Sequence, residues 1–501
     1  MEETGFGKWR QRLWPIRRFE LRKLLPLLLM KFFISFNYAI LTCLKDTFIV
    51  TEKGSGAEVI PVLKGWIVLP VALIVTLIYS KLSNHFKRST LFNGIIIFFL
   101  GFTLIYAFVL YPYKEFLSPH ASADFLTELI GQKYSHWIAI YRNWMQTLFF
   151  VVAELWGGVV IFLLFWGFVN QISLLGEAKR FYTLFIAAGD VASLSAGPLA
   201  RYYALKYAHT EFTATLQWLT GYAVLFGLII MGLHWWINKY VLVDKRFFDP
   251  VKMGLPIGGK TKLSLWEGVK FIASSKYLRC LAVMVVSYGL AINLVEVSWK
   301  ANLKLAYPNP SDYQAFIASV TTMVGLFSLL IAFFVGGGII RKVGWHFSAQ
   351  ITPVIVGATG LVFLALIIAK DWISPLTALI GLSPLILIVT FGAFQNVISK
   401  VVKYSFFDPT KEMAFIPLDQ ESKVKGKAAI DVVGSRLGKS GSAWIQLGLI
   451  ELAGTGSVLS ISSYLFPFIA LTMIYWIYSV RSLNRQASLD SPKKLEMETS
   501  S

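Results

Sequence analysis

Charged side chains occur inside long apolar segments of this 501-residue chain, and four of them resist an ordinary structural explanation: Lys45, Glu154, Glu296 and Lys439. Charged groups are costly within a bilayer and usually face a cavity or a partner, so such positions mark paths for substrates or ions. Glu154 lies midway in its segment, and Lys439 lies among small residues that leave room for a ligand. Cations contributed by both parts of the chain suit a large polyanion. The carboxylates would balance those cations in an empty site, or bind a proton or a sugar hydroxyl; the alternative is two structural Lys–Glu pairs.

Other ionisable residues in the apolar segments have simpler explanations. Lys31 and Arg279 lie near a predicted membrane boundary, where long side chains reach water by snorkelling. We expect Lys300 and Arg142 to do the same at the outer face. For Asp190 and Asp431, structural and functional roles are equally open. Asp46 and Arg436 complete the set of ionisable residues in the apolar segments.

Several signals that suggest enzymes or metal sites fail on closer inspection. The run GSRLGKS at 434–440 resembles a phosphate-binding P-loop, but it has three residues between its glycines where that motif needs four. The six histidines are scattered, so neither a metal site nor a cofactor is predicted. Two cysteines cannot form a disulfide framework. A lipid-modifying transferase would need a cluster of catalytic residues at the membrane surface, and the sequence has none, so we expect no enzymatic activity.

The apolar segments define the fold class. Hydrophobic residues make up 56% of the chain and charged residues 15%, against about 25% charged residues in soluble domains. Because a membrane-spanning helix needs about 20 apolar residues, the sequence predicts an all-α polytopic membrane protein with about twelve transmembrane helices. The fifth and eleventh are the weakest, and the number falls to eleven or ten if they are re-entrant. The predicted spans are 24–50, 61–80, 91–111, 138–170, 181–204, 217–240, 277–300, 314–338, 348–369, 375–399, 429–451 and 458–480.

The positive charge of the chain follows the same membrane pattern. Lys and Arg number 47 against 28 Asp and Glu, a net charge of +19 that in a soluble protein would suggest a nucleic-acid partner. Here the cations gather at the N-terminus and in alternate connections, as they do in loops that stay in the cytoplasm. The N-terminal segment also lacks the cleavage site of a signal peptide. We therefore expect a multi-pass inner-membrane protein with both termini in the cytoplasm. Its expected partner is the lipid bilayer, and no nucleic-acid partner is expected.

The longest basic connection divides the predicted spans six and six. This gives an N-terminal six-helix half at 1–240, a cytoplasmic linker at 241–276, a C-terminal six-helix half at 277–482 and a cytoplasmic polar tail at 483–501. Residues 264–275 of the linker fit a short amphipathic helix on the membrane surface. Transporters of the major facilitator type have this plan of two related halves, so we expect a major-facilitator-like fold.

Seven sequence runs carry a more specific resemblance. The longest, 403–419 and onward through 423–429, reads KYSFFDPTKEMAFIPLD and then KVKGKAA. Shorter runs are LKDT at 44–47, GAEVIP at 56–61, AELWG at 153–157, EAKRFY at 177–182, NLVE at 293–296 and LGKSG at 437–441. Together they closely resemble the nucleotide transporter family, the ATP/ADP translocases of plastids and obligate intracellular bacteria.

The resemblance implies electrogenic exchange of internal ADP, with phosphate, for host ATP by alternating access. By match to the family's motifs, it also implies that the four charged residues named first are essential for transport. The candidate substrate-binding set further includes Arg436 and Asn293. ATP and ADP are then the expected substrates of a monomeric carrier, and the inner membrane of an intracellular bacterium is favoured over the plastid inner envelope.

One alternative stays open within this family. A proton-coupled importer of several nucleoside triphosphates would use Glu154 or Glu296 as its proton site. Base preference, phosphate co-transport and the aromatic residues that contact the base are also undecided by the sequence.

Overall fold

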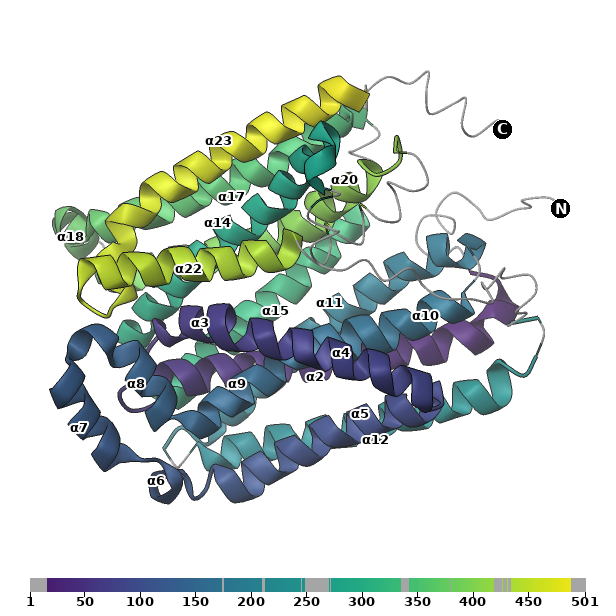
Figure 1. The fold of residues 1–501 in the computed structure, drawn as a ribbon, viewed down its shortest axis with the longest axis horizontal. Coiled ribbons are helices and arrows are strands. Elements are labelled where there is room, and N and C mark those ends of the chain that lie inside the picture. Colours follow the sequence, from purple (N-terminus) through teal and green to yellow (C-terminus); the bar gives the residue numbers. More distant parts are fainter. Residues whose placement is uncertain are drawn as a thin grey trace.

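The protein forms a bundle of long helices in the computed structural model (Figure 1). The structure describes residues 16–173, 175–209, 212–244, 246–247, 270, 272–334, 342–379, 381–418, 426, 430 and 434–487. These residues contain no β-strand. The predicted linker at 241–276, including its expected amphipathic helix, lies mostly outside the described residues, as does most of the predicted tail.

The first part of the chain forms six long helical segments, which we call the N-terminal bundle. Three short helices, α6 (Lys114–Leu117), α7 (His120–Ile130) and α8 (Ser135–Arg142), connect the third segment to the fourth. The long helices are α2 (Leu21–Thr51), α3 (Val59–Val62) continuing into α4 (Leu69–His85), α5 (Arg88–Ile105), α9 (Trp144–Trp156) continuing into α10 (Gly167–Ile172), α11 (Leu175–Lys206) and α12 (Thr213–Trp236).

The second part of the chain forms the C-terminal bundle. In Figure 1 its helices α14, α17, α22 and α23 lie together, next to the N-terminal bundle. Its members are α14 (Lys276–Ala306), α15 (Pro310–Phe334), α17 (Trp345–Ile368), α18 (Lys370–Leu379), α19 (Pro384–Val402), α20 (Asp408–Met413), α22 (Ser435–Ala453) and α23 (Ser462–Ala487).

Eleven of the described helical segments are long and apolar enough to cross a membrane. The eleventh predicted span corresponds to α22, which has 19 residues but is not among these segments. Its polar residues, Lys439 among them, lower its hydropathy. The fifth predicted span does qualify, as Arg180–Lys206. The fourth begins later than expected, because α8 ends at Arg142 and the spanning segment starts at Trp144.

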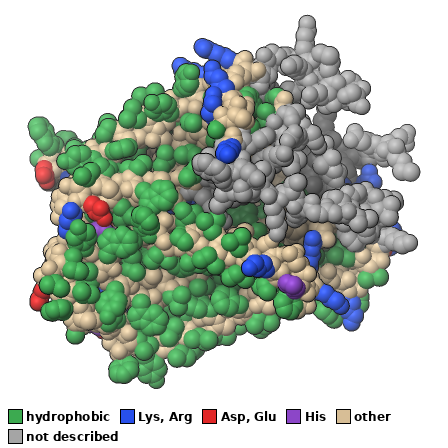
Figure 2. Space-filling model, in the orientation of Figure 1, with side chains coloured by type: hydrophobic (Ala, Val, Ile, Leu, Met, Phe, Trp, Pro, Cys, Tyr) green, Lys and Arg blue, Asp and Glu red, His purple; other side chains and the backbone are tan. Residues whose placement is uncertain are grey.

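The surface of the bundle agrees with a membrane location. Figure 2 shows apolar side chains over the face between the two ends of the molecule, and Lys and Arg gathered toward one end. We call this the basic end, where α2 begins and α23 finishes, and the other the opposite end. Because lipid tails require an apolar surface, this belt identifies a multi-span membrane protein. Cations at or near the helix ends on this side include Lys81, Lys87, Arg88, Lys276, Arg279, Arg481 and Arg485.

Several helices of the N-terminal bundle contain π-helical turns. Leu63–Val68 joins α3 to α4, and Gly157–Trp166 joins α9 to α10. In the C-terminal bundle, Lys403–Phe407 joins α19 to α20. A π-helical turn inserts extra residues into the helical repeat, rotates the following side chains and is frequent at functional sites.

Two glycines allow α11 of the N-terminal bundle to pack closely on α15 of the C-terminal bundle. A Cβ atom at Gly197 would lie 2.6 Å from the carbonyl oxygen of Ala318, and one at Gly325 would lie 2.6 Å from the backbone nitrogen of Leu194. Between helices in a membrane there is little hydrophobic driving force, so stability depends on close van der Waals contact between small residues.

Replacing Gly325 with Ala should therefore destabilise the protein, because the new methyl group would meet backbone atoms that cannot move aside. We expect a loss of about 1–3 kcal/mol, typical of overpacking, measured as a lower thermal unfolding midpoint in detergent. Gly221→Ala is the matched control, since a Cβ at Gly221 of α12 has nothing within 4 Å. Equal midpoints for the two variants would contradict a close contact at Gly325.

Candidate functional site

Lys45 lies at the start of a buried network of charges between the bundles. Its ammonium nitrogen is 2.9 Å from Oε1 of Glu154 and 3.1 Å from Oδ1 of Asp46. The same nitrogen is 4.3 Å from the ring centroid of Phe150. Phe150 and Glu154 are four residues apart on α9, so both face α2. Lys45 thus has two carboxylates and an aromatic face around one ammonium group.

The network continues onto α14 through Lys300. Its ammonium nitrogen lies 2.9 Å from Oδ2 of Asp46 and 3.0 Å from Oε1 of Glu296. We expected Lys300 to snorkel toward the outer face, but only 2% of its side chain is exposed. Burial of a lysine is tolerated where its charge is paired, and two carboxylates provide that pairing. Asp46 belongs to the N-terminal bundle and Lys300 to the C-terminal bundle, so this ion pair joins the two.

A second contact between the bundles involves Lys64, which we did not single out from the sequence. Lys64 lies in the π-helical turn at Leu63–Val68, with its nitrogen 3.8 Å from Oε2 of Glu296. It also donates a hydrogen bond of 2.9 Å to Oδ1 of Asn293. The sequence does place Lys64 inside the second predicted span, but so close to the membrane boundary that it resembles an ordinary flanking lysine. Asn293, which was a candidate, is 4% exposed.

One face of α14 supplies much of this site. Asn293, Glu296 and Lys300 follow a spacing of three and four residues, which places them on one side of a helix. Gly289, one turn before Asn293, contacts α22: a Cβ there would lie 3.0 Å from the Cα atom of Gly438. The adjacent glycines bring the backbones of α14 and α22 together.

Lys439 immediately follows this contact between glycines. Its side chain is exposed, and it forms no ion pair with any residue that the structure describes. It does act electrostatically on the Glu154 carboxylate. We expect Glu154 and Glu296 to balance Lys45 and Lys439 in the empty protein; Glu154 does contact Lys45, whereas Glu296 contacts Lys300 and Lys64. The ammonium group of Lys439 is therefore accessible to a ligand.

The remaining sequence candidates contribute less. The side chain of Arg436 and the whole of Asp431 lie outside the described residues. Lys31 is buried and donates a hydrogen bond to Ser35, and Asp190 acts on it electrostatically. Arg142 is also buried, with its guanidinium 2.5 Å from Asp124. These three therefore do not reach the central network through any described ion pair.

Contacts between the bundles close the opposite end of the molecule. Thr47 of α2 donates a hydrogen bond to the Gln314 side chain of α15, and Lys304 of α14 donates one to the backbone oxygen of Ser55. Glu58 lies beside Lys304; burial raises the pKa of its carboxyl group above the ordinary value, and the Lys304 ammonium partly offsets this. The central charges are thus shielded from this side.

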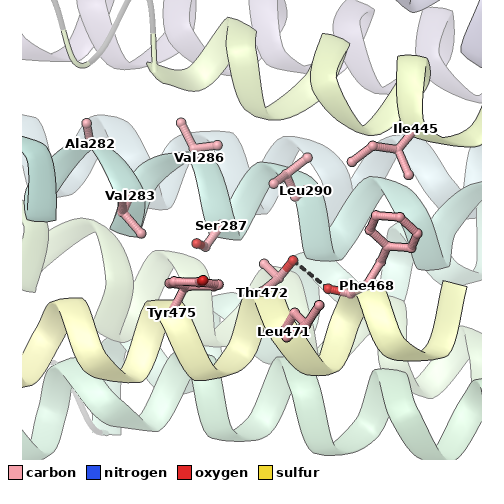
Figure 3. A pocket seen from close by; sticks show the side chains of 10 residues that line it. All are labelled: Ala282, Val283, Val286, Ser287, Leu290, Ile445, Phe468, Leu471, Thr472 and Tyr475. Atoms are coloured by element: carbon pink, nitrogen blue, oxygen red, sulfur yellow. Dashed lines mark hydrogen bonds between the residues drawn. The ribbon is translucent and has the colours of Figure 1, made fainter.

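A cavity elsewhere in the C-terminal bundle is unsuited to a polyanion. It has a volume of about 410 Å³ and lies between α14, α22 and α23 (Figure 3). Its lining is apolar apart from the hydroxyl groups of Ser287, Thr472 and Tyr475, and the Thr472 hydroxyl donates to the backbone oxygen of Phe468. Tyr475 is 62% exposed, so the cavity opens on the outer surface of the bundle. The charged network is the better candidate site.

Replacing Lys300 with Met should destabilise the protein strongly, because Asp46 and Glu296 would face each other without their shared cation. Removing one partner of a buried ion pair costs about 3–5 kcal/mol, measurable as a lower unfolding midpoint in detergent. A second change, Asp46→Asn, should recover part of the loss. Lys276→Met is the control, since Lys276 is exposed on the same helix; if it matches Lys300→Met, the network does not explain the effect.

The arrangement of helices is similar to that of a known transporter structure. A bacterial homologue of the iron transporter ferroportin, in an inward-facing state, superposes with a TM-score of 0.58 at 13% identity, covering 92% of this chain and 98% of that one. At this identity the likeness concerns the fold, which is of the major facilitator type.

Comparison of sequences gives the family. The family model of the TLC ATP/ADP transporter matches residues 1–487. The chain is 45% identical over 490 residues to ADP,ATP carrier protein 1 of Chlamydia pneumoniae, covering 97% of this chain and 95% of that protein. It is 42% identical to ADP,ATP carrier protein 1, chloroplastic, of Arabidopsis thaliana (95% and 76% covered), and 38% identical to ADP,ATP carrier protein 1 of Rickettsia prowazekii (97% of both). The chain therefore belongs to the TLC ATP/ADP transporter family.

Proposed function

We propose that this protein is an antiporter that imports ATP in exchange for ADP, accompanied by phosphate, by alternating access. The observation that carries the proposal is the group of lysines at the junction of the bundles. Lys45 and Lys64 come from the N-terminal bundle, and Lys300 and Lys439 come from the C-terminal bundle. A nucleotide phosphate chain carries several negative charges, and it is bound by ammonium groups that approach from both bundles.

The carboxylates of the same site offset most of the charge of its four lysines when it is empty. Three carboxylates, those of Asp46, Glu154 and Glu296, each have a lysine nitrogen within 3.8 Å. When a nucleotide enters, its phosphate oxygens replace these carboxylates as partners of the lysines. Because each carboxylate already has a lysine partner, the site favours exchange of anions over proton coupling.

Obligate exchange follows from the two ion pairs that cross between the bundles. The Asp46–Lys300 and Lys64–Glu296 pairs must separate before the opposite end opens. Separating a buried ion pair is costly unless new partners replace the lost ones, so the empty carrier seldom reorients. A bound phosphate chain supplies the lysines with new partners and lowers this barrier. The carrier therefore crosses between its two states when loaded with ATP or ADP.

The location of the protein follows from its charge distribution and its relatives. Loops rich in Lys and Arg stay in the cytoplasm, so we place the basic end there, with both termini. Among the relatives are bacterial and plastid proteins, and we propose the inner membrane of an intracellular bacterium. One chain supplies all the charges of the site, so we propose that the carrier works as a monomer without a cofactor.

Uptake of labelled ATP into proteoliposomes tests the exchange directly. We expect rapid uptake into vesicles preloaded with ADP, little uptake into empty vesicles, and no response to an imposed proton gradient. Uptake into empty vesicles that follows the proton gradient would instead establish the proton-coupled importer. Vesicles without protein measure the background leak.

The role of Lys439 is tested in the same vesicles. Lys439→Gln should lower ATP uptake by about a hundredfold or more, because removing one partner of a charge pair costs 2–5 kcal/mol or more, while the protein remains folded and inserted. Lys87→Gln, which removes an exposed cation at the basic end, should transport normally. Full activity of Lys439→Gln would refute its assignment as a phosphate-binding residue.

A further inference from the structure

Tyr38 lies on the same face of α2 as Lys45 and closer to the basic end. The two residues are seven positions apart, which is two helical turns. The ring of Tyr38 packs on Gly157, where a Cβ atom would lie 3.0 Å from Cε2 and 3.3 Å from Cζ of the tyrosine. Gly157 follows Glu154 by three residues, so this contact lies about one turn from the Lys45–Glu154 ion pair. A larger residue at 157 would push the ring away.

A second tyrosine, Tyr404, belongs to the C-terminal bundle. It lies in the π-helical turn at Lys403–Phe407 and is 41% exposed. The Lys403 nitrogen is 4.4 Å from the centroid of its ring, and Asp408 holds that lysine at 3.0 Å. This cation over one face of the ring restricts its orientation and leaves the other face for a ligand.

Tyr38 and Tyr404 lie near each other on opposite bundles. Each lies within electrostatic range of the other, and Tyr38 also lies within range of Lys403. Although both residues are described in the structure, their rings are not in contact with each other. Nearby, Tyr288 of α14 stacks on Phe407 with centroids 4.9 Å apart and an angle of 26°. That stack supports the turn that carries Tyr404.

From this placement we infer that Tyr38 and Tyr404 form the binding site for the nucleobase, one ring from each bundle. The inference rests on the proposed function, since it places the rest of a nucleotide whose phosphates the lysines hold. Seven residues of helix span about 10 Å along the axis, a separation that the ribose and phosphate chain bridge. Aromatic side chains stack on the flat faces of bases. Closure of the bundles brings the two rings together around the base.

The base-binding site would let the carrier select nucleotides over inorganic phosphate chains, which the lysines alone cannot do. Ammonium groups bind any chain of phosphates, including inorganic polyphosphate. Stacking adds affinity only when a base is attached, so the carrier takes nucleotides in preference to inorganic chains. Because every base has a flat face, stacking recognises the class of ligand rather than the identity of the base.

Titration calorimetry on purified protein in detergent tests the inference, with ATP, ADP and inorganic tripolyphosphate as the three ligands. Tyr38→Ala should weaken ATP and ADP binding by about tenfold or more, as expected for the loss of one stacking partner. Its affinity for tripolyphosphate should change less than about twofold, because stacking contributes only where a base is present. Tyr38→Phe, which keeps the ring, should bind all three ligands as the unmodified protein does.

Two further variants serve as a second test and as a negative control. Tyr404→Ala alters an exposed side chain and should show the same selective loss, which keeps the test available if Tyr38→Ala fails to fold. Tyr478→Ala changes a tyrosine of α23 that is 61% exposed, and it should bind all ligands normally.

The possible results separate this inference from the proposed function. Unchanged ATP and ADP binding in both Tyr38→Ala and Tyr404→Ala overturns the inference, and so does an equal loss for nucleotides and tripolyphosphate. If the unmodified protein binds neither nucleotides nor tripolyphosphate, the proposed function itself is wrong. Selective loss of the nucleotides alone supports both.

Discussion

The burial of charge at the junction of the bundles is the constraint on which the rest of the structure depends. Lysines cannot lie unpaired in an apolar interior without a large cost, and here Lys45 and Lys300 each contact two carboxylates. Meeting this requirement draws α2, α9 and α14 together at one point. The network is therefore structural in the empty protein and, by our proposal, becomes the binding site when a polyanion arrives.

Small residues make this convergence possible. Where Gly289 meets Gly438, the backbones of α14 and α22 approach closely enough to place Lys439 beside the network. Gly157 does the same for the ring of Tyr38. Lipid provides no hydrophobic force between helices, so ion pairs and close glycine contacts must together hold the bundles. A structure held by a few such contacts also has two stable arrangements more readily than one held by a continuous apolar core.

The fold and part of the site could be predicted from the sequence, and the limits have physical causes. Apolar length predicts most of the helices, but α22 is too polar to qualify by hydropathy because it carries polar residues, among them the candidate Lys439. The cost of burial directs attention to Lys45 and Glu154, whose charged atoms lie 2.9 Å apart. It does not reveal which cations Glu296 contacts, because that depends on how α14 packs against the turn that carries Lys64.

Two lysines show the limit most clearly. Lys300 has the length to snorkel, and only the position of Asp46 on another helix decides that it stays buried. Lys64 lies near the start of its span, where a lysine normally reaches water. It lies in a π-helical turn, and its side chain instead contacts Glu296 and Asn293. In both cases the deciding contact comes from the other bundle. Local spacing cannot supply that information.

The position of the network along the helices bears on how a carrier of this kind would work. Lys45 is six residues from the end of α2 at Thr51, or about 9 Å along the helix axis. The contacts that close the opposite end, such as Thr47 with Gln314, lie directly beyond it. A ligand that takes Lys300 from Asp46 therefore acts within two turns of the closing contacts. Binding and opening are coupled by proximity, and no long relay through the protein is required.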